Sequence, residues 1–319
     1  MLSPSQPWSE SNGKSVYLLT AVRNEADFIG LFLSEIRDVF LKSGLLSRVK
    51  LVIVDDGSTD NTVSVITDFA KDLSNLRIEV LQLSSNRGNQ SAMAYGVRHL
   101  ARQLQDGHLL TFDADGEDDI TRLPELVRML DRDANRIIFV YRDSRKEDVY
   151  VRAFYYSYRI LYRILTGRKV IPCNVMAIPG TMIPAIVGSP LLSLHFSYPP
   201  LRLGLPYQAV PMARRQRYGG RSSQNIGLLF HHALIGLTIF YEDVVARLML
   251  FSAGLVGVTL LVALGLIIVR FAAPHALPVG FTTVVFMSLF GFGFVTLVLL
   301  ISFCLACSTF RLLIEQSRD

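Results

Sequence analysis

Residues 108–119 read HLLTFDADGEDD, and this stretch organises the rest of the chain. Its first residues form a short apolar run, which predicts a strand buried in a sheet. Packing many like charges where a strand ends is unfavourable unless donors or a cation compensate them, and a hard divalent ion is the natural partner. The stretch therefore predicts a cation site after a buried strand. Its carboxylates are Asp113, Asp115, Glu117, Asp118 and Asp119.

The order of residues within this acidic stretch suggests which carboxylates meet an ion. Asp113 and Asp115 flank the small residue Ala114, so on an extended backbone they point to the same side. Gly116 allows a sharp turn, after which Glu117 supplies a third oxygen. An isolated D-x-D more often belongs to a solvated acidic loop before a helix, and only the rest of the chain decides between the two interpretations.

Strands and helices alternate on both sides of this stretch. Alternation of this kind predicts an α/β fold with a doubly wound, mainly parallel sheet. Strands are expected at Ser15–Val22, Val49–Val54, Arg77–Leu83 and Ile137–Val140, and helices at 28–40, 62–73, 90–104 and 124–131. Ligands of such sheets bind at the carboxyl ends of the strands, so residues that follow strand ends should share one crevice with the acidic stretch. They are Asn24, Glu25, Asp55, Asp56 and Asn86.

Charge and motif content narrow the kind of ligand. Neither a Walker-type glycine loop nor G-x-G-x-x-G occurs, so a bound diphosphate has to be neutralised by metal and arginine. The formal net charge is a modest +5, and we expect no nucleic-acid partner. Arginines crowd at residues 214–221, just ahead of an apolar region, where anionic lipid or substrate phosphates would meet them.

Two uncharged runs predict a membrane-spanning hairpin at about 248–269 and 281–306. The first, Leu248 to Val269, would make about 33 Å of helix, and the second, Ala276 to Phe310, is long enough to cross with tilt. Arginines at 214–221, 311 and 318 put the N-terminal domain and the C-terminus in the cytoplasm, with Arg270 as a minor objection. The expected divisions are a disordered lead-in at 1–14, a domain at 15–225, an interfacial helix at 226–246, the two spans within 247–311, and a tail at 312–319.

Three segments between the sheet and the hairpin are harder to assign. Residues 151–169 predict a helix with arginines on one face, which suits a membrane surface or an ordinary solvated face equally. Residues 170–201 contain many prolines, so we expect irregular, apolar, pocket-forming structure there. Residues 226–241 are short for a span, which favours an interfacial helix over a third crossing.

Several motifs together resemble glycosyltransferase family 2. They are V-x-N-E at 22–25, VDDGSTD at 54–60, N-x-G at 86–88, DAD at 113–115, R-x-x-R at 142–145 and R-x-x-G-x-S at 217–222. More narrowly, the chain is similar to polyprenyl-phosphate glycosyltransferases, relatives of dolichyl-phosphate mannose synthase that carry two C-terminal membrane helices. The resemblance covers roughly Ser15 to Arg311. It implies a GT-A fold and inverting transfer of a sugar from a UDP- or GDP-linked donor to a membrane polyprenyl phosphate.

The resemblance also implies a role for individual positions. A metal site for Mg²⁺ or Mn²⁺ falls on Asp113 and Asp115, to which the acidic stretch of this chain adds Glu117 as a third oxygen. Donor-binding positions are Val22, Asn24, Glu25, Asp55, Asp56, Asn86, Asp113 and Ala114. Catalytic positions are Asp115, Glu117, Arg142, Arg145 and Arg217. Positions for the acceptor or its lipid phosphate are Arg217, Arg221 and Ser222, to which the arginine face of residues 151–169 adds Arg159 and Arg163.

Departures from the family pattern bear on the donor sugar more than on the reaction class. Residues 116–119, GEDD, replace the Leu-Gln and paired prolines that often follow the D-x-D, and Asn89 stands where lysine is common. One alternative is a transferase acting on another lipid or on a polysaccharide, but the Q-x-x-R-W motif of polysaccharide synthases is absent, since the single tryptophan is Trp8. Another is an inactive, nucleotide-sensing membrane scaffold, which the intact aspartates disfavour. Glycines in the apolar runs permit a homo-oligomer.

Overall fold

The structure is a computed structural model that describes residues 13–72, 75–104, 106–142, 149–168, 175–213, 215–219, 234–273, 278 and 280–316. The chain divides into two compact units. The first comprises Met1–Arg152 and Ile171–Asn225, and the second comprises Ala153–Val170 and Ile226–Asp319. The sheet therefore belongs to the first unit, and both long apolar helices belong to the second.

The first unit is built on a seven-stranded sheet in the order β3-β2-β1-β4-β6-β5-β7. Its strands are β1 Ser15–Val22, β2 Val49–Asp55, β3 Arg77–Gln82, β4 Gly107–Thr111, β5 Ile137–Arg142, β6 Val175–Pro179 and β7 Tyr207–Met212. Neighbours pair in parallel except β6, which is antiparallel to both β4 and β5. This confirms the predicted GT-A-type α/β fold with a doubly wound, mainly parallel sheet.

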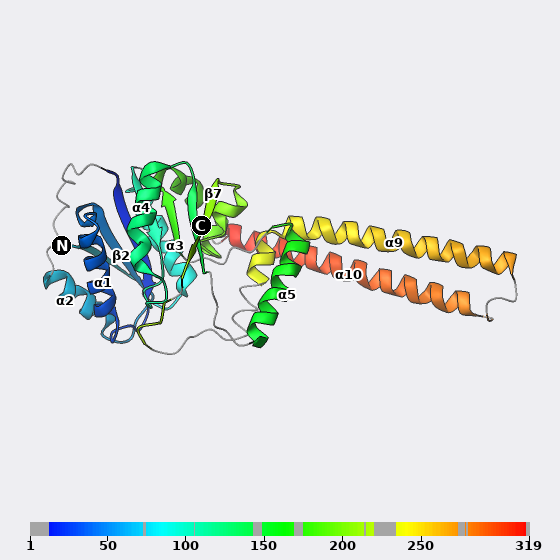
Figure 1. Ribbon diagram of the computed structural model, residues 1–319. Coiled ribbons are helices and arrows are strands. Elements are labelled where there is room, and N and C mark those ends of the chain that lie inside the picture. The colour runs from blue at the N-terminus through cyan, green and yellow to red at the C-terminus, as the bar shows by residue number, and fades with distance from the viewer. Residues whose placement is uncertain are drawn as a thin grey trace. The chain divides into compact units, whose positions relative to one another are not determined.

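Helices cover both faces of this sheet (Figure 1). They are α1 Ile29–Lys42, α2 Thr62–Asp72, α3 Asn89–Leu100, α4 Leu123–Arg132, α6 Ile183–Gly188 and α7 Pro199–Arg202, with short 3-10 turns at Leu46–Arg48, Ile120–Arg122, Gly180–Met182 and Pro190–Ser193. Along β1 the side chains alternate between two cores, as a pleated strand requires. Val16 and Leu18 pack with α1, α2 and α4, whereas Tyr17 and Leu19 pack with α3 and α6. A hydrophobic core on each face of the sheet therefore holds β1 in place, and with it the loop that follows the strand.

The prediction of irregular structure at residues 170–201 is wrong. This region supplies β6, whose five residues are all buried between β4 and β5, and then α6. Many prolines usually indicate irregular structure, but in this region prolines occupy positions that helices and strands tolerate. Pro179 ends β6, and Pro184 lies in the first turn of α6, where no intrahelical amide is needed. Strand β7 was also not predicted. It lies at the edge of the sheet, where its side chains alternate between exposed and half-buried, so it lacks the continuous apolar run of a central strand.

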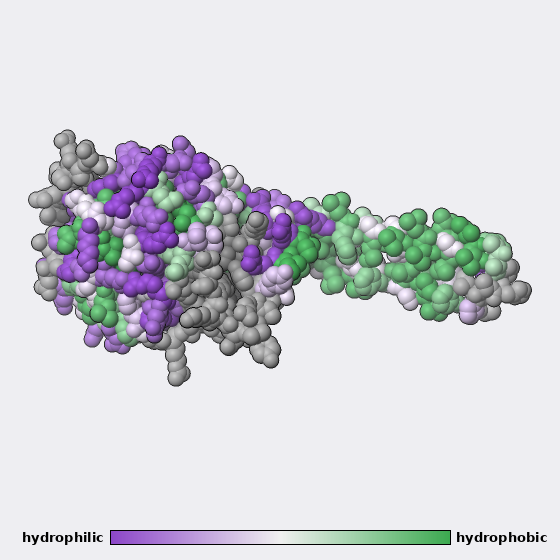
Figure 2. All heavy atoms as spheres, viewed as in Figure 1, coloured by the Kyte–Doolittle hydropathy of each residue, from purple (hydrophilic) through white to green (hydrophobic). Residues whose placement is uncertain are grey.

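The second unit contains two helices that are long and apolar enough to cross a membrane. They are α9 Tyr241–Ala272 and α10 Phe281–Gln316, with mean hydropathy 2.5 and, over Phe281–Ala306, 2.6. Hydrophobic residues cover the visible face of this hairpin (Figure 2). Such a surface is unfavourable in water and favourable in lipid, so the chain associates with a membrane. Residues 241–246 of the predicted interfacial segment form the first turns of α9.

Helix α5, Val149–Thr166, packs by its C-terminal half against the start of α9. Tyr162 is buried and meets the ring of Phe240 edge-on, with centroids 6.4 Å apart. The Arg168 guanidinium lies 4.7 Å from the centre of that ring, and its Nε is 3.4 Å from an Asp243 carboxylate oxygen. These contacts fix the end of α5 to the helix that enters the hairpin.

Candidate functional site

The carboxyl ends of β1, β2, β3 and β4 bring the predicted site residues to one edge of the sheet. These four strands are neighbours and parallel, so the loops that follow them leave the sheet in the same direction. The loops carry Asn24, Glu25, Asp56 and Asn86, together with residues 113–119, called the acidic turn below; Asp55 is the last residue of β2. The expectation that sequence-distant polar residues gather at one edge therefore holds in the structure.

Asn24 and Glu25 lie in a loop that is bonded to the loop after β2. Asn24 has a φ of 53°, a left-handed conformation that asparagine adopts more readily than most residues. Its backbone N–H donates to Ser58 Oγ at 3.0 Å, and its side-chain oxygen accepts from the Thr59 N–H at 2.8 Å. The Glu25 N–H donates to Thr62 Oγ1 at 2.9 Å. The backbone N–H of Glu25 is therefore held by the first residue of α2, whereas its carbonyl oxygen accepts from the N–H groups of Phe28 and Ile29.

Asp55 and Asp56 order the loops around them. Both are only 3% exposed. Asp55 accepts hydrogen bonds from the N–H and hydroxyl of Ser58, whereas Asp56 accepts from the N–H groups of Arg87 at 2.7 Å and Gly88 at 2.9 Å. Asp56 thereby ties the end of β2 to the N-x-G loop before α3. Each carboxylate oxygen has two lone pairs, so these hydrogen bonds leave Asp55 and Asp56 able to accept others from a ligand. The assignment of both residues to donor binding stays a prediction.

Three of the five carboxylates in the acidic turn accept hydrogen bonds from nearby backbone, and one of them is Asp115, whose Oδ1 accepts from the Glu117 N–H at 3.0 Å. Asp118 is buried, and its Oδ2 accepts from the Asp113 N–H at 3.0 Å. Asp119 accepts from the Thr121 N–H at 3.2 Å and so caps the following 3-10 turn. Gly116 makes the reversal with a φ of 84°. Asp113, Glu117 and the second carboxylate oxygen of Asp115 remain as the candidates for an ion.

The donor set suits a metal that also binds substrate phosphates. Burial raises the pKa of Asp115, and the neighbouring Asp113 carboxylate raises it further, so a cation would relieve a real repulsion. Within the described residues, no three Asp, Glu, His or Cys side chains form a preassembled metal cluster. Mg²⁺ commonly uses one or two carboxylates and completes its shell with phosphate oxygens and water. Asp113 and Asp115 fit that pattern, and Glu117 as a third ligand stays a prediction.

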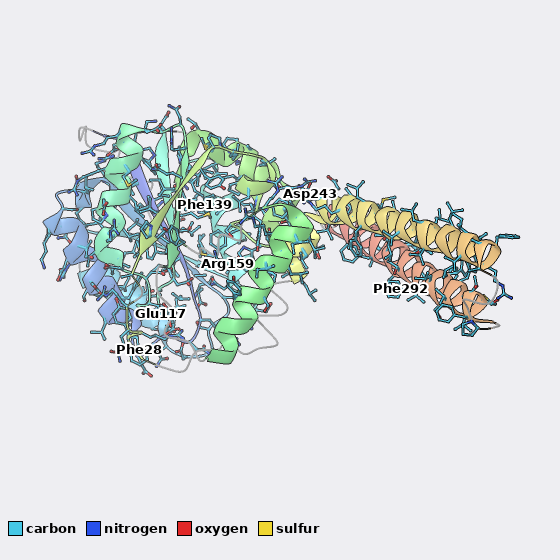
Figure 3. All side chains as sticks on the ribbon, turned by 45° about the vertical axis from the view of Figure 1, so that its right-hand side comes forward. Phe28, Glu117, Phe139, Arg159, Asp243 and Phe292 are labelled. Carbon is cyan, nitrogen blue, oxygen red and sulfur yellow. The ribbon has the colours of Figure 1, made fainter. Side chains whose placement is uncertain are left out.

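Arg217 is brought to the acidic turn from another part of the chain. Its Nη2 lies 3.6 Å from Asp115 Oδ2 and 3.8 Å from Glu25 Oε1. Burial raises the pKa of Glu25, and Arg217 opposes that shift. Residues 215–219 also contact Glu117 and the ring of Phe28, and Figure 3 labels those two residues at the same end of the first unit. The Arg217 guanidinium therefore lies between the carboxylates of Asp115 and Glu25, where we expect the diphosphate of a donor to bind.

Sequence reasoning missed Glu35. It lies on α1, where its Oε1 accepts a hydrogen bond from Arg215 and its Oε2 accepts one from the Tyr218 hydroxyl. Burial and the hydrogen bond to Glu35 raise the pKa of Tyr218, and the same carboxylate raises that of Arg215. An acidic residue on an amphipathic helix looks like any solvent-facing position, so no pattern in the sequence signals this contact.

The other predicted positions divide into three groups. Val22 and Ala114 are in the site region but buried, so they offer backbone rather than side chain to a ligand. Arg159 and Arg163 lie exposed on α5 in the second unit. Residues whose placement or side chain lies outside the described part of the chain are Arg142, which ends β5, and Arg145, Arg221 and Ser222.

Known proteins match parts of this chain. Over 91 residues it is 35% identical to the dolichyl-phosphate beta-glucosyltransferase of Saccharomyces cerevisiae, covering 28% of this chain and 26% of that protein. Over 157 residues it is 24% identical to the undecaprenyl-phosphate 4-deoxy-4-formamido-L-arabinose transferase of Yersinia pestis, covering 49% and 46%. The chain thus matches between about a quarter and about half of the length of these curated relatives.

A solved structure and a family profile place the fold and the family. Glucosyl-3-phosphoglycerate synthase from Mycobacterium tuberculosis, crystallised with Mg²⁺ and uridine diphosphate, superposes with a TM-score of 0.50 at 16% identity, over 73% of this chain and 80% of that one. At that identity the likeness shows the fold alone. The profile of glycosyl transferase family 2 matches residues 17–184, more than half of the chain. The chain therefore belongs to glycosyl transferase family 2.

Proposed function

We propose that this chain transfers a sugar, with inversion of its anomeric centre, from a UDP- or GDP-linked donor to a membrane polyprenyl phosphate. The observation that carries the proposal is the acidic turn facing Arg217, in a chain that continues into two helices able to cross a membrane. The two relatives above support the acceptor class, because both are named for a polyprenyl phosphate.

Asp113 and Asp115 are the residues proposed to hold Mg²⁺ or Mn²⁺ together with the donor diphosphate, with Glu117 as a further candidate. The ion would stabilise the negative charge that grows on the departing diphosphate. Arg217 adds a fixed positive charge beside Asp115, and the arginines at 142 and 145 are proposed to add theirs. Asp55, Asp56, Asn24, Glu25 and Asn86 are proposed to surround the nucleoside.

The nucleophile needs little help from the protein. In the transfer, the bond between the anomeric carbon and the diphosphate oxygen breaks, and a bond to an oxygen of the lipid phosphate forms on the opposite face of the sugar. A phosphate monoester has a second pKa of about 6, so near neutral pH this oxygen is already anionic. Catalysis then rests on alignment and electrostatics, with Asp115 or Glu117 at most assisting.

The second unit is proposed to present the acceptor. On α5, Tyr156, Ile160 and Ile164 are exposed at four-residue spacing, beside the exposed Arg159 and Arg163. Apolar and basic residues arranged in this way suit an anionic lipid surface. Arg221 and Ser222 are proposed, from the family motif, to bind the acceptor phosphate. The arginine-rich side, with the catalytic unit and the C-terminus, is proposed to be cytoplasmic. In sealed cytoplasmic-side-out vesicles, added protease should then degrade the first unit.

The test is a transfer assay with labelled UDP- and GDP-sugars, membranes containing the protein, and undecaprenyl or dolichyl phosphate. Label should move into the organic extract. Asp115→Asn should reduce this transfer about 100-fold or more, since it weakens the binding of the cation that would stabilise the negative charge growing on the diphosphate. Asp68→Asn is the matched control, because among the described contacts Asp68 forms only an exposed ion pair with Lys71 on α2. Full activity of the Asp115 variant would contradict the metal assignment.

The alternatives give different results in the same assay. Label that enters another lipid or a polysaccharide, with none in a polyprenyl product, would assign the chain to a different acceptor. Nucleotide binding without turnover of any donor would favour the inactive membrane scaffold.

A further inference from the structure

Residues 215–219 lie along the acidic turn and follow its backbone. The Arg215 N–H donates to the Glu117 carbonyl oxygen at 2.8 Å, and the Tyr218 N–H donates to the Asp115 carbonyl oxygen at 3.1 Å. Backbone hydrogen bonds of this kind are available to almost any sequence. They hold the segment on the turn, but they do not by themselves decide where the side chain between them, Arg217, is aimed.

Glu35 supplies a side-chain anchor for this segment. Its Oε1 is 2.5 Å from Arg215 Nη1, and its Oε2 accepts a hydrogen bond from the Tyr218 hydroxyl. One carboxylate therefore grips two residues that flank Arg217 on either side. A pairing that uses both carboxylate oxygens fixes orientation as well as distance, which a single contact does not.

The helix that carries Glu35 has little freedom to move. Its neighbours Phe32, Leu33 and Ile36 are fully buried in the core beneath α1. Close-packed interiors resist displacement, so a shift of Glu35 would require the core to repack. The segment also rests on the start of this helix, because a Cβ at Gly219 would lie 2.2 Å from the Phe28 ring. Glu35 is therefore a fixed point against which the segment is set.

We propose that Glu35 is a positioning residue that sets Arg217 over the acidic turn and so tunes capture of the donor diphosphate. Arg217 reaches Asp115 and Glu25 from the stretch of backbone that Glu35 holds on both sides. Without that grip the segment must be ordered when the donor binds, and this costs affinity. This inference rests on the proposed function for its choice of ligand.

The main variant is Glu35→Ala, measured as donor KM and kcat and as affinity for UDP and GDP with Mg²⁺. We expect kcat/KM for the donor to fall about 10- to 100-fold, with a raised KM, because small misplacements of a charge-bearing group have effects of this order. Glu35→Gln keeps an acceptor oxygen and should recover part of the loss. Asp38→Ala is the matched control, since Asp38 is an acidic residue on the same helix that pairs only with Arg37 among the described contacts.

A double-mutant cycle separates positioning from a general structural role. If Glu35 acts through Arg217, then Glu35→Ala should have little further effect on donor KM once Arg217 is alanine. A merely structural role would lower the amount of active protein, leave donor KM unchanged, and reduce activity by the same factor in both backgrounds. That pattern would overturn the proposal.

Hydrogen exchange provides a readout that needs no turnover. Amide exchange in residues 215–219 should be faster in Glu35→Ala than in the wild-type chain, and unchanged in Asp38→Ala. A wild-type chain that binds nucleotide but labels no lipid would reject the proposed acceptor and leave the Glu35 comparison valid through nucleotide affinity. Unaltered exchange together with unaltered nucleotide affinity in Glu35→Ala would reject the positioning role, whatever the acceptor.

Discussion

Replacing Gly116 by alanine should damage the acidic turn more than its backbone conformation alone accounts for. Gly116 has a φ of 84°, where a Cβ is disfavoured by about 1–2 kcal/mol. A Cβ there would also lie 2.6 Å from Cδ2 of Tyr218. Carbon atoms prefer separations of about 3.5–4.0 Å, so the ring and its segment must move. Overpacking of this kind costs about 1–3 kcal/mol, which makes the expected total about 2–5 kcal/mol.

Gly44 offers a matched control. Its φ is 75°, and a Cβ built there would meet nothing within 4 Å. Gly44→Ala should therefore cost only the conformational part, about 1–2 kcal/mol. The difference between the two variants isolates the contact with Tyr218. In a Tyr218→Ala background, Gly116→Ala should cost about as much as Gly44→Ala, because the ring that it strikes is gone.

Pulse proteolysis of the detergent-solubilised full chain across a urea gradient measures these free energies of unfolding for the first unit. Donor turnover measured in parallel should fall for Gly116→Ala and stay near the wild-type value for Gly44→Ala. Equal destabilisation by the two alanines, or a Gly116→Ala cost that stays above that of Gly44→Ala without the Tyr218 ring, would refute the packing of residues 215–219 on the turn.

Three further outcomes are expected. Removing divalent ions with EDTA should abolish transfer, and added Mg²⁺ or Mn²⁺ should restore it; full activity in chelator would contradict a metal-dependent reaction. Asp118→Ala should destabilise the first unit by about 1–3 kcal/mol, since it removes a buried carboxylate and leaves the part-buried Asp113 N–H without its acceptor, and pulse proteolysis against the exposed control Asp68→Ala checks this. Burial lowers the pKa of His108 in the folded chain. Below about pH 6.5 the unfolded chain therefore binds a proton at this residue more readily than the folded chain does, so the free energy of unfolding decreases as the pH is lowered. His108→Gln should flatten that dependence between pH 7 and pH 5, and an unchanged slope would show that His108 does not cause it.

Local pattern was sufficient for most of the sheet domain. Apolar runs such as Val49–Asp55 have no plausible place except a strand covered on both faces, and the helices between them carry their apolar residues at helical spacing. The edge at which the motifs meet followed from the rule for parallel strands. Strand β6 was not predicted because its proline, Pro179, is acceptable only at the end of a strand, and the position of that end depends on pairing with β4 and β5.

The sequence by itself determined the α/β class, the two apolar helices and the gathering of aspartates at one edge, because these depend on periodicity and on composition within short stretches. The tertiary structure alone decided which carboxylates serve the backbone, as Asp56 and Asp118 do, and which ones face Arg217. It also decided that Glu35 grips a segment 180 residues further along the chain. Hydrogen-bond partners depend on how distant elements pack, and a charged residue on a helix carries no local sign of the partner that it will meet.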